Sequence, residues 1–199
     1  QSYKKVLKFE PDNLDSQLNM GLVFLERGEL DLALKSLLNI LESNPDCAKA
    51  HNNIGVVLQK TNHPKKAIEH FKFAIDSEPN YAEAYFNMGT TLMEANELAL
   101  ASNYFRQAIQ LQPNYIDAHY NLGNSLREQK KYQLAIIQYT KVIEINSKHI
   151  KSRLNIASIF DRKGQFDKAL DEYQRVIEID ANCGQAYSSM GSLLRRKGD

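Results

Sequence analysis

The chain has 199 residues, of which 43% are hydrophobic and 25% are charged, a composition typical of a folded globular protein. Its formal net charge of +1 argues against nucleic acid or an anionic membrane as the main partner. No apolar run approaches the roughly 18 residues that a transmembrane helix needs, so we expect no direct membrane insertion.

Similar segments recur along the chain at a spacing of 34 residues. LNMGLVFLERGELDLAL, NNIGVVLQKTNHPKKAI, FNMGTTLMEANELALAS, YNLGNSLREQKKYQLAI and LNIASIFDRKGQFDKAL align without gaps. Three series of residues share the period: Gly21, Gly55, Gly89, Gly123, Ala157 and Gly191; Ala33, Ala67, Ala101, Ala135 and Ala169; and Pro11, Pro45, Pro79 and Pro113. Several coincident series without an insertion indicate a repeat protein rather than a single compact domain.

The series define the elements in chain order. Residues 1–13 are predicted to be the second helix of a preceding repeat, and 184–199 the first helix of a following one. Between them lie complete repeats at 14–47, 48–81, 82–115, 116–149 and 150–183. Within the third repeat, AEAYFNMGTTLMEA and LALASNYFRQAIQL both place apolar residues at helical spacing, which predicts a helix pair. Proline at the end of a repeat separates one pair from the next.

This period, with its small residues and closing proline, resembles the tetratricopeptide repeat (TPR), and the resemblance covers the whole chain. It implies an all-α fold, a right-handed superhelix (α-solenoid) of antiparallel helix pairs that forms a single array. Counting positions from the first residue of each repeat, we expect glycine at position 8 to face alanine at position 20. The two helices of a pair could then approach closely.

Position 6 is asparagine in every complete repeat: Asn19, Asn53, Asn87, Asn121 and Asn155, here called the asparagine ladder. Asparagine is a poor helix former, so its recurrence requires a reason. A carboxamide both donates and accepts hydrogen bonds, so a row of them can bind the main chain of an extended peptide. The series resembles the ladder in the repeat domain of the O-linked N-acetylglucosamine transferase and in armadillo-type carriers. Alternatively, these side chains hydrogen-bond between adjacent first helices, and the two roles can coexist.

Further side chains at positions 2, 5, 9, 12 and 13 should line the same concave face. The predicted peptide-binding set adds Leu18, Leu22, Val56, Phe86, Met93, Tyr120, Asn124, Arg127 and Leu154 to the ladder. Some of these residues could instead pack between first helices. Acidic and basic residues at these positions are balanced, so no strongly charged ligand is expected there.

A heat-shock chaperone tail is disfavoured as a partner. The carboxylate clamp of chaperone-binding TPR proteins needs lysine at position 5 and asparagine at position 9 of one repeat. Position 5 holds Leu18, Asn52, Phe86, Tyr120 and Leu154, and no repeat supplies the pair.

Catalytic, metal and cofactor sites are not predicted. His51 and His119 occupy position 4, where an aromatic residue fills the core, and His70 and His149 look isolated. No histidine pair has i, i+4 spacing and no Cys-x-x-Cys occurs. Two cysteines favour an intracellular, cytoplasmic protein. We therefore expect a protein–protein interaction scaffold that binds an extended peptide segment and has no enzymatic activity, nucleic-acid partner or cofactor.

Two alternatives remain open. The array could be the substrate-recognition segment of a larger enzyme, such as a glycosyltransferase, or it could self-assemble head to tail through uncapped ends. Tyr187, Met190 and Leu194 on the last helix would then contact Tyr3, Val6 and Leu7 of another copy.

The turn inside each repeat has one unusual residue. Position 15 is Gly28, Asn62, Asn96, Lys130, Gly164 and Gly198, and glycine and asparagine tolerate positive φ. Lys130 is thus predicted to have a strained, left-handed backbone. Because this turn should lie away from the asparagine ladder, Lys130→Gly is expected to leave binding unchanged.

Overall fold

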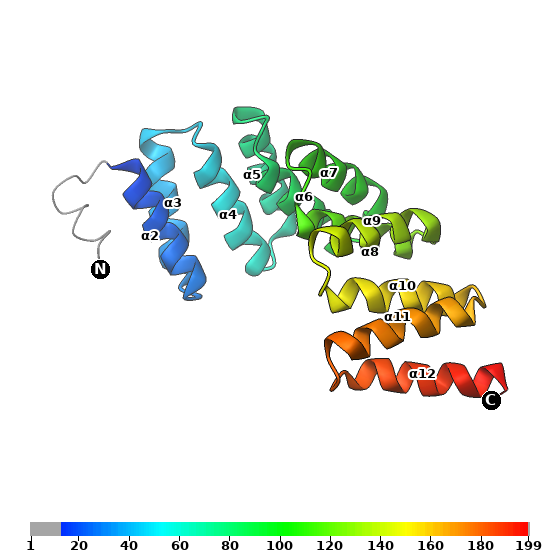
Figure 1. Ribbon diagram of the computed structural model, residues 1–199. Helices are drawn as coiled ribbons and strands as arrows, with labels where there is room; N and C mark the ends of the chain where they lie inside the picture. The colour runs from blue at the N-terminus through cyan, green and yellow to red at the C-terminus, as the bar shows by residue number, and fades with distance from the viewer. Residues whose placement is uncertain (1–12, 199) are drawn as a thin grey trace. The chain divides into compact units, whose positions relative to one another are not determined.

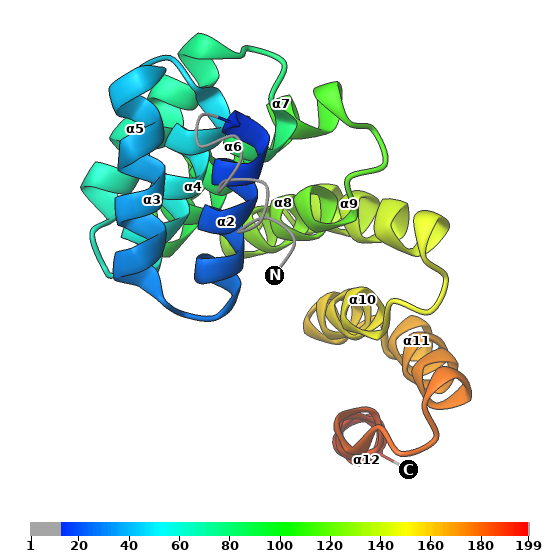
Figure 2. The same cartoon turned by 90° about the vertical axis from the view of Figure 1, so that its left-hand side faces the viewer.

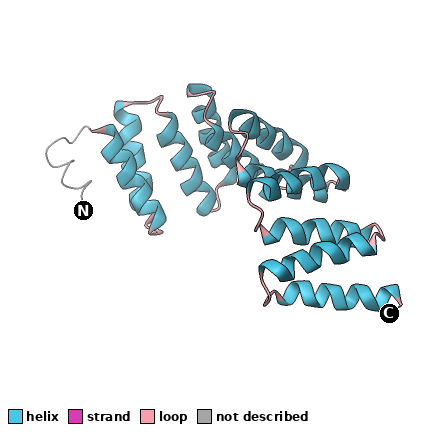
Figure 3. Ribbon diagram, viewed as in Figure 1, coloured by secondary structure: helices cyan, strands magenta, loops and turns pink. Residues whose placement is uncertain are grey.

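A computed structural model of the chain describes residues 13–198, and the described residues form helices without strands (Figures 1 and 3). The helices are α2 (Leu14–Glu26), α3 (Leu30–Ser43), α4 (Ala48–Lys60), α5 (Pro64–Ser77), α6 (Ala82–Glu94), α7 (Leu98–Leu111), α8 (Ile116–Glu128), α9 (Tyr132–Ile145), α10 (Ile150–Arg162), α11 (Phe166–Ile179) and α12 (Gly184–Lys197). First helices begin at Leu14 and every 34 residues thereafter to Gly184. The all-α repeat fold is confirmed, whereas the helix expected near residues 1–10 lies outside the described residues.

The chain divides into two compact units, unit 1 up to Pro113 and unit 2 from Asn114 onward. In unit 1, α2 packs on α3, α4 on α5 and α6 on α7, and successive pairs join where α3 packs on α4 and α5 on α6. Figure 2 shows α2 and α3 as one antiparallel pair in front of the later helices of unit 1. In unit 2, α8 to α12 pack in chain order, each on the next. The repeat period itself runs through residue 113 without an insertion, so it carries no sign of this division.

Glycine at position 8 lets the two helices of a pair approach closely, but the residue that it faces is not the expected one. A Cβ added at Gly55 would lie 2.5 Å from the Phe71 ring, and one at Gly123 would lie 2.6 Å from the Tyr139 ring. The nearest neighbour is therefore the large residue at position 24, not the alanine at position 20. Ala67 and Ala135 are nevertheless fully buried, as a close helix pair requires.

The turns between paired helices confirm the prediction for position 15. Lys130 has a φ of 60°, beside 62° at Asn62 and 63° at Asn96, and Gly28, Gly164 and Gly198 are also positive. A side chain in this conformation costs roughly 1 kcal/mol relative to glycine. Lys130 is thus the most strained residue type found at these turns.

The last helix leaves part of its apolar surface uncovered. Tyr187 is 52% exposed, whereas Leu193 of the same helix is fully buried in the core that α12 shares with the preceding repeat. Head-to-tail association through this surface stays a prediction, because the expected partner residues Tyr3, Val6 and Leu7 lie outside the described residues.

Candidate functional site

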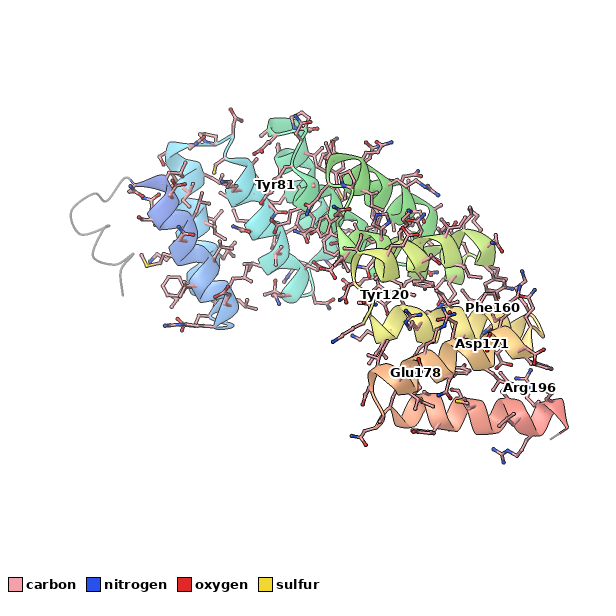
Figure 4. All side chains as sticks on the ribbon, viewed as in Figure 1. Tyr81, Tyr120, Phe160, Asp171, Glu178 and Arg196 are labelled. Atoms are coloured by element: carbon pink, nitrogen blue, oxygen red, sulfur yellow. The ribbon has the colours of Figure 1, made fainter. Side chains whose placement is uncertain are left out.

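A cavity of about 340 Å³ opens among the first helices of unit 1, and we call it the groove pocket. The residues lining it come from α2, α4 and the start of α6: Asp15, Leu18, Asn19, Leu22, Lys49, Asn53, Tyr81 and Glu83. Apart from Tyr81, which immediately precedes α6 (Figure 4), these residues occupy positions 2, 5, 6 and 9. The structure thus brings together Leu18, Asn19, Leu22 and Asn53 of the predicted set.

Two members of the asparagine ladder line this pocket, and their side chains have no hydrogen-bond partner within the described residues. Asn19 is half-buried and Asn53 is only 6% exposed, and neither side chain makes a hydrogen bond within the described residues. Their amide atoms are not among the fully buried side-chain atoms that lack a partner, so they stay accessible to solvent. The free amides can therefore donate to and accept from a ligand that enters the pocket.

Asn87, the next member, is used differently. It donates to Asn52 Oδ1 at 2.9 Å, and fully buried Asn52 donates to the Tyr81 hydroxyl at 3.3 Å and to Glu83 Oε1 at 3.4 Å. The Tyr81 hydroxyl also donates to Glu83 at 3.3 Å. Burial, with the neighbouring Glu83 carboxylate, raises the pKa of Tyr81, so the phenol stays protonated. This network joins the second and third repeats, and two of its members, Tyr81 and Glu83, line the groove pocket.

In unit 2, Asn155 also has protein partners. It donates to Asn124 Oδ1 at 3.2 Å and to the Tyr120 hydroxyl at 3.5 Å, and it accepts from Arg127 Nη1 at 2.8 Å. Asn124 in turn accepts from the Tyr139 hydroxyl at 2.8 Å. Tyr120 lies near the start of α10 (Figure 4), where its ring contacts His149 edge-on. Asn121 is half-buried, and its side chain makes no hydrogen bond within the described residues.

The apolar members of the predicted set differ in exposure. Leu18 and Leu154 are buried in the cores of units 1 and 2, although Leu18 also lines the groove pocket. Leu22 is 38% exposed in that pocket. Val56, Phe86, Met93 and Tyr120 are half-buried, and the rings of Phe86 and Tyr120 lie 5.9 Å from those of Phe105 and Tyr139. Packing inside the array therefore uses part of the surface that the sequence assigned to a ligand.

A second cavity, of about 250 Å³, lies in unit 2 where α8 turns into α9 and meets α10. We call it the basic pocket, and its lining is Arg127, Glu128, Lys130, Tyr132, Ser158 and Arg162. The sequence predicted that the Lys130 turn lies away from the asparagine ladder, and no ladder asparagine lines the basic pocket. Lys130 shares the pocket with Arg127, which donates to Asn155. A cation at the usual glycine position was the signal that could have revealed this pocket.

The histidines at position 4 are buried, as expected, but His70 is not isolated. His51 Nδ1 lies 3.0 Å from His70 Nδ1, and His51 Nε2 lies 2.9 Å from the Pro45 carbonyl oxygen. Burial lowers the pKa of His70, and the neighbouring His51 lowers it further.

In the part of the chain that the structure describes, no group of three or more His, Cys, Asp or Glu side chains could hold a metal ion. None of the described helices is long and apolar enough to cross a lipid bilayer.

Family models cover most of the chain. Models described as "Tetratricopeptide repeat" match residues 18–80, 116–149 and 150–183, and one described as "TPR repeat" matches residues 89–126. No curated protein matches the chain.

Solved structures with the same helix-pair architecture include three that cover most of the chain. The crystal structure of MamA is 25% identical, with a TM-score of 0.76 over 83% of this chain and 96% of that one. YrrB, described as a TPR protein with an unusual peptide-binding site, is 22% identical, with a TM-score of 0.76 over 95% and 97%. PilF of Pseudomonas aeruginosa is 24% identical, with a TM-score of 0.78 over 94% and 82%.

Proposed function

Because the chain belongs to the tetratricopeptide repeat family, we propose that it is a protein-interaction scaffold whose groove pocket binds an extended peptide segment of a partner. The observation that carries this proposal is the pair of amides, Asn19 and Asn53, which line one cavity and have no hydrogen-bond partner within the described residues. The family models and solved structures that match this chain are those of repeat scaffolds, which supports an interaction role. YrrB shares the fold and is described as having a peptide-binding site, and that likeness adds support only at the level of the fold.

Main-chain binding fits the placement of the two amides in one cavity. They lie at the same position of α2 and α4, on helices that contact each other. Each amide can accept from a peptide N–H and donate to a peptide C=O, and this pairing does not depend on the peptide's side chains. Specificity then comes from the rest of the lining. Leu22 offers an apolar contact, while Asp15, Glu83 and Lys49 offer charges of both signs.

The test is selection from a displayed library of short random linear peptides. We expect the unmodified protein to enrich binders, and Asn19→Ala with Asn53→Ala to weaken each binder. Loss of one neutral hydrogen bond per amide, at about 0.5–1.5 kcal/mol each, corresponds to a total weakening of roughly five- to 150-fold. Asn39→Ala is the matched control, because Asn39 is exposed on α3 of the same unit and does not line the pocket.

Main-chain recognition is tested separately. A selected binder should lose affinity when its backbone amides are methylated, because N-methylation removes the donor and leaves the side chains unchanged. Binding that survives both the double substitution and the methylation would refute the proposal.

A further inference from the structure

The basic pocket carries an inference that does not depend on peptide binding in the groove pocket, since it lies wholly within unit 2. Its lining contains three cations, Arg127, Lys130 and Arg162, and one carboxylate, Glu128. The Glu128 carboxylate is paired with Arg127 at 2.8 Å. The side chains of Lys130 and Arg162 make no ion pair or hydrogen bond within the described residues. Asp161, the nearest acid in the sequence to Arg162, is paired with Arg196 at 2.8 Å.

Arg127 is held in a fixed orientation. Its Nη1 donates to Asn155 at 2.8 Å and its Nη2 donates to Glu128 at 2.8 Å. A guanidinium has five N–H donors, so two bonded groups leave others for a ligand. The hydroxyls of Ser158 and Tyr132 add two neutral donors to the same lining, and neither is engaged within the described residues.

Lys130 gives a second, independent reason to assign a ligand. At the same turn, all the other repeats use glycine or asparagine, and only here does a long cationic side chain occupy a backbone with a φ of 60°. A strained residue persists when something outweighs its cost, and such residues cluster at functional sites. Here the strained residue lines a cavity whose lining also includes two arginines.

We infer that the basic pocket binds the phosphoryl group of a phosphorylated side chain on a protein partner. A phosphomonoester carries about −1.5 to −2 charges at pH 7 and three strong acceptor oxygens. The pocket has two more positive than negative charges, which matches that dianion better than the single charge of a carboxylate. Its volume of about 250 Å³ is below the range of roughly 300–1,000 Å³ typical of pockets for drug-sized ligands, so it suits one side chain.

The experiment is a nuclear magnetic resonance titration of the full chain, followed through the backbone amides of residues 127–132 and 158–162. The probes are a neutral Ala/Gly peptide with one central phosphoserine, the same peptide with serine, the same peptide with glutamate, and inorganic phosphate. We expect saturable shifts with phosphoserine, no shifts with serine and binding at least about tenfold weaker with glutamate. Inorganic phosphate should compete for the same amides but bind more weakly than the phosphopeptide.

Two variants remove ligand contacts, and one is a charge-matched control. Arg162→Ala should weaken phosphopeptide binding about tenfold, since a charge-assisted hydrogen bond contributes at least that factor. Lys130→Gly should weaken it several-fold while the protein stays fully folded, because glycine suits the positive φ. Lys148→Ala makes the same change in net charge but lies beyond the far end of α9, about 20 Å along that helix from the basic pocket. It should change the affinity for the phosphopeptide less than about twofold.

Four outcomes would overturn the inference. Equal weakening by Lys148→Ala and Arg162→Ala would mean that only the overall charge attracts the peptide. Equal binding of the serine peptide would exclude an anion site, and equal binding of the glutamate peptide would exclude selection for phosphate. Inorganic phosphate that bound as tightly as the phosphopeptide would mean a free-anion site rather than a site for a partner's side chain.

Discussion

Asn53 in unit 1 and Asn155 in unit 2 occupy the same repeat position but have different surroundings. Asn53 lines a cavity and has no partner within the described residues, whereas Asn155 is bonded to Asn124, Tyr120 and Arg127. The difference arises from the preceding repeat. Repeat 4 offers Tyr120, Asn124 and Arg127 at positions 5, 9 and 12, while the first repeat offers Leu18, Leu22 and Leu25 there. A recurrent residue therefore has a role set by its neighbours, so the asparagine ladder divides into open and bonded members.

The largest expected effect comes from breaking the bonded network in unit 1. Asn52→Ala removes a fully buried amide that links Asn87, Tyr81 and Glu83. Leaving buried polar groups without a partner costs about 1–3 kcal/mol each. We expect the free energy of unfolding, measured by urea titration, to fall by about 2 kcal/mol.

Its neighbour Asn53 provides the control for that measurement. Asn53→Ala removes an amide that is unpaired in the described part of the chain and introduces a better helix former, so stability should change by less than about 0.7 kcal/mol. If Asn53→Ala destabilises the protein as much as Asn52→Ala does, the division into open and bonded members is wrong.

The second prediction tests the bonded member of unit 2. Asn155→Ala frees Arg127 from a hydrogen bond of 2.8 Å, and bonds to charged groups contribute about 1.5–3 kcal/mol. Since Arg127 is partly exposed, solvent replaces part of the lost interaction, and we expect a loss of about 1 kcal/mol. Phosphopeptide binding should weaken too, although Asn155 itself does not line the basic pocket.

Chemical denaturation gives the stability change, and the titration described above gives the affinity. Asn121→Ala is the comparison, because Asn121 occupies the same position in the same unit and its side chain makes no hydrogen bond within the described residues. A loss of stability without a loss of phosphopeptide affinity would show that Asn155 does not position Arg127.

Helix capping gives a smaller, pH-dependent contrast between the units. Asn13 caps α2 by accepting from the Ser16 N–H at 2.9 Å, and His149 caps α10 by accepting from the Ser152 N–H through Nδ1 at 3.2 Å. Only a neutral imidazole can accept. Burial lowers the pKa of His149 from the ordinary histidine value of 6.5, and the nearby Asp117 opposes this only in part.

The folded protein therefore binds fewer protons at this site than the unfolded chain does. The contribution of His149 to the free energy of unfolding is fully present above pH 6.5 and is lost as the pH falls below that value. His149→Asn keeps the acceptor without the titration, so the fall in thermal midpoint between pH 7 and pH 5 should shrink. His70, whose pKa is also lowered by burial, contributes to the fall that remains. An unchanged pH dependence in His149→Asn would contradict this assignment.

The sequence predicted the fold well because the repeat period constrains each helix independently of the others. The third repeat was expected at 82–95 and 98–111, and α6 and α7 occupy Ala82–Glu94 and Leu98–Leu111. The candidate site was harder to predict from the sequence, because it depends on contacts between residues 28 to 35 positions apart, such as Arg127 with Asn155 and Asn52 with Asn87. Periodicity identifies equivalent positions but does not say which neighbours they contact. The peptide-binding role of the predicted residues stays a prediction.

The smallest expected effect isolates the strain at Lys130 from its charge. Lys130→Gly relieves a positive φ of 60°, worth roughly 1 kcal/mol, while the added freedom of the unfolded chain offsets part of that gain. We expect the free energy of unfolding to be unchanged or to rise by up to about 1 kcal/mol.

Gly164→Lys makes the reverse change at the equivalent turn of the next repeat, where φ is 70° and no atom lies within 4 Å of an added Cβ. Because nothing there would clash, its expected cost of about 1 kcal/mol measures backbone strain alone. Equal and opposite shifts in the two urea titrations would mean that the strain is the same at both turns. Stability lost by Lys130→Gly would instead mean that the lysine side chain makes a stabilising contact, and its place in the basic pocket would then need no ligand to explain it.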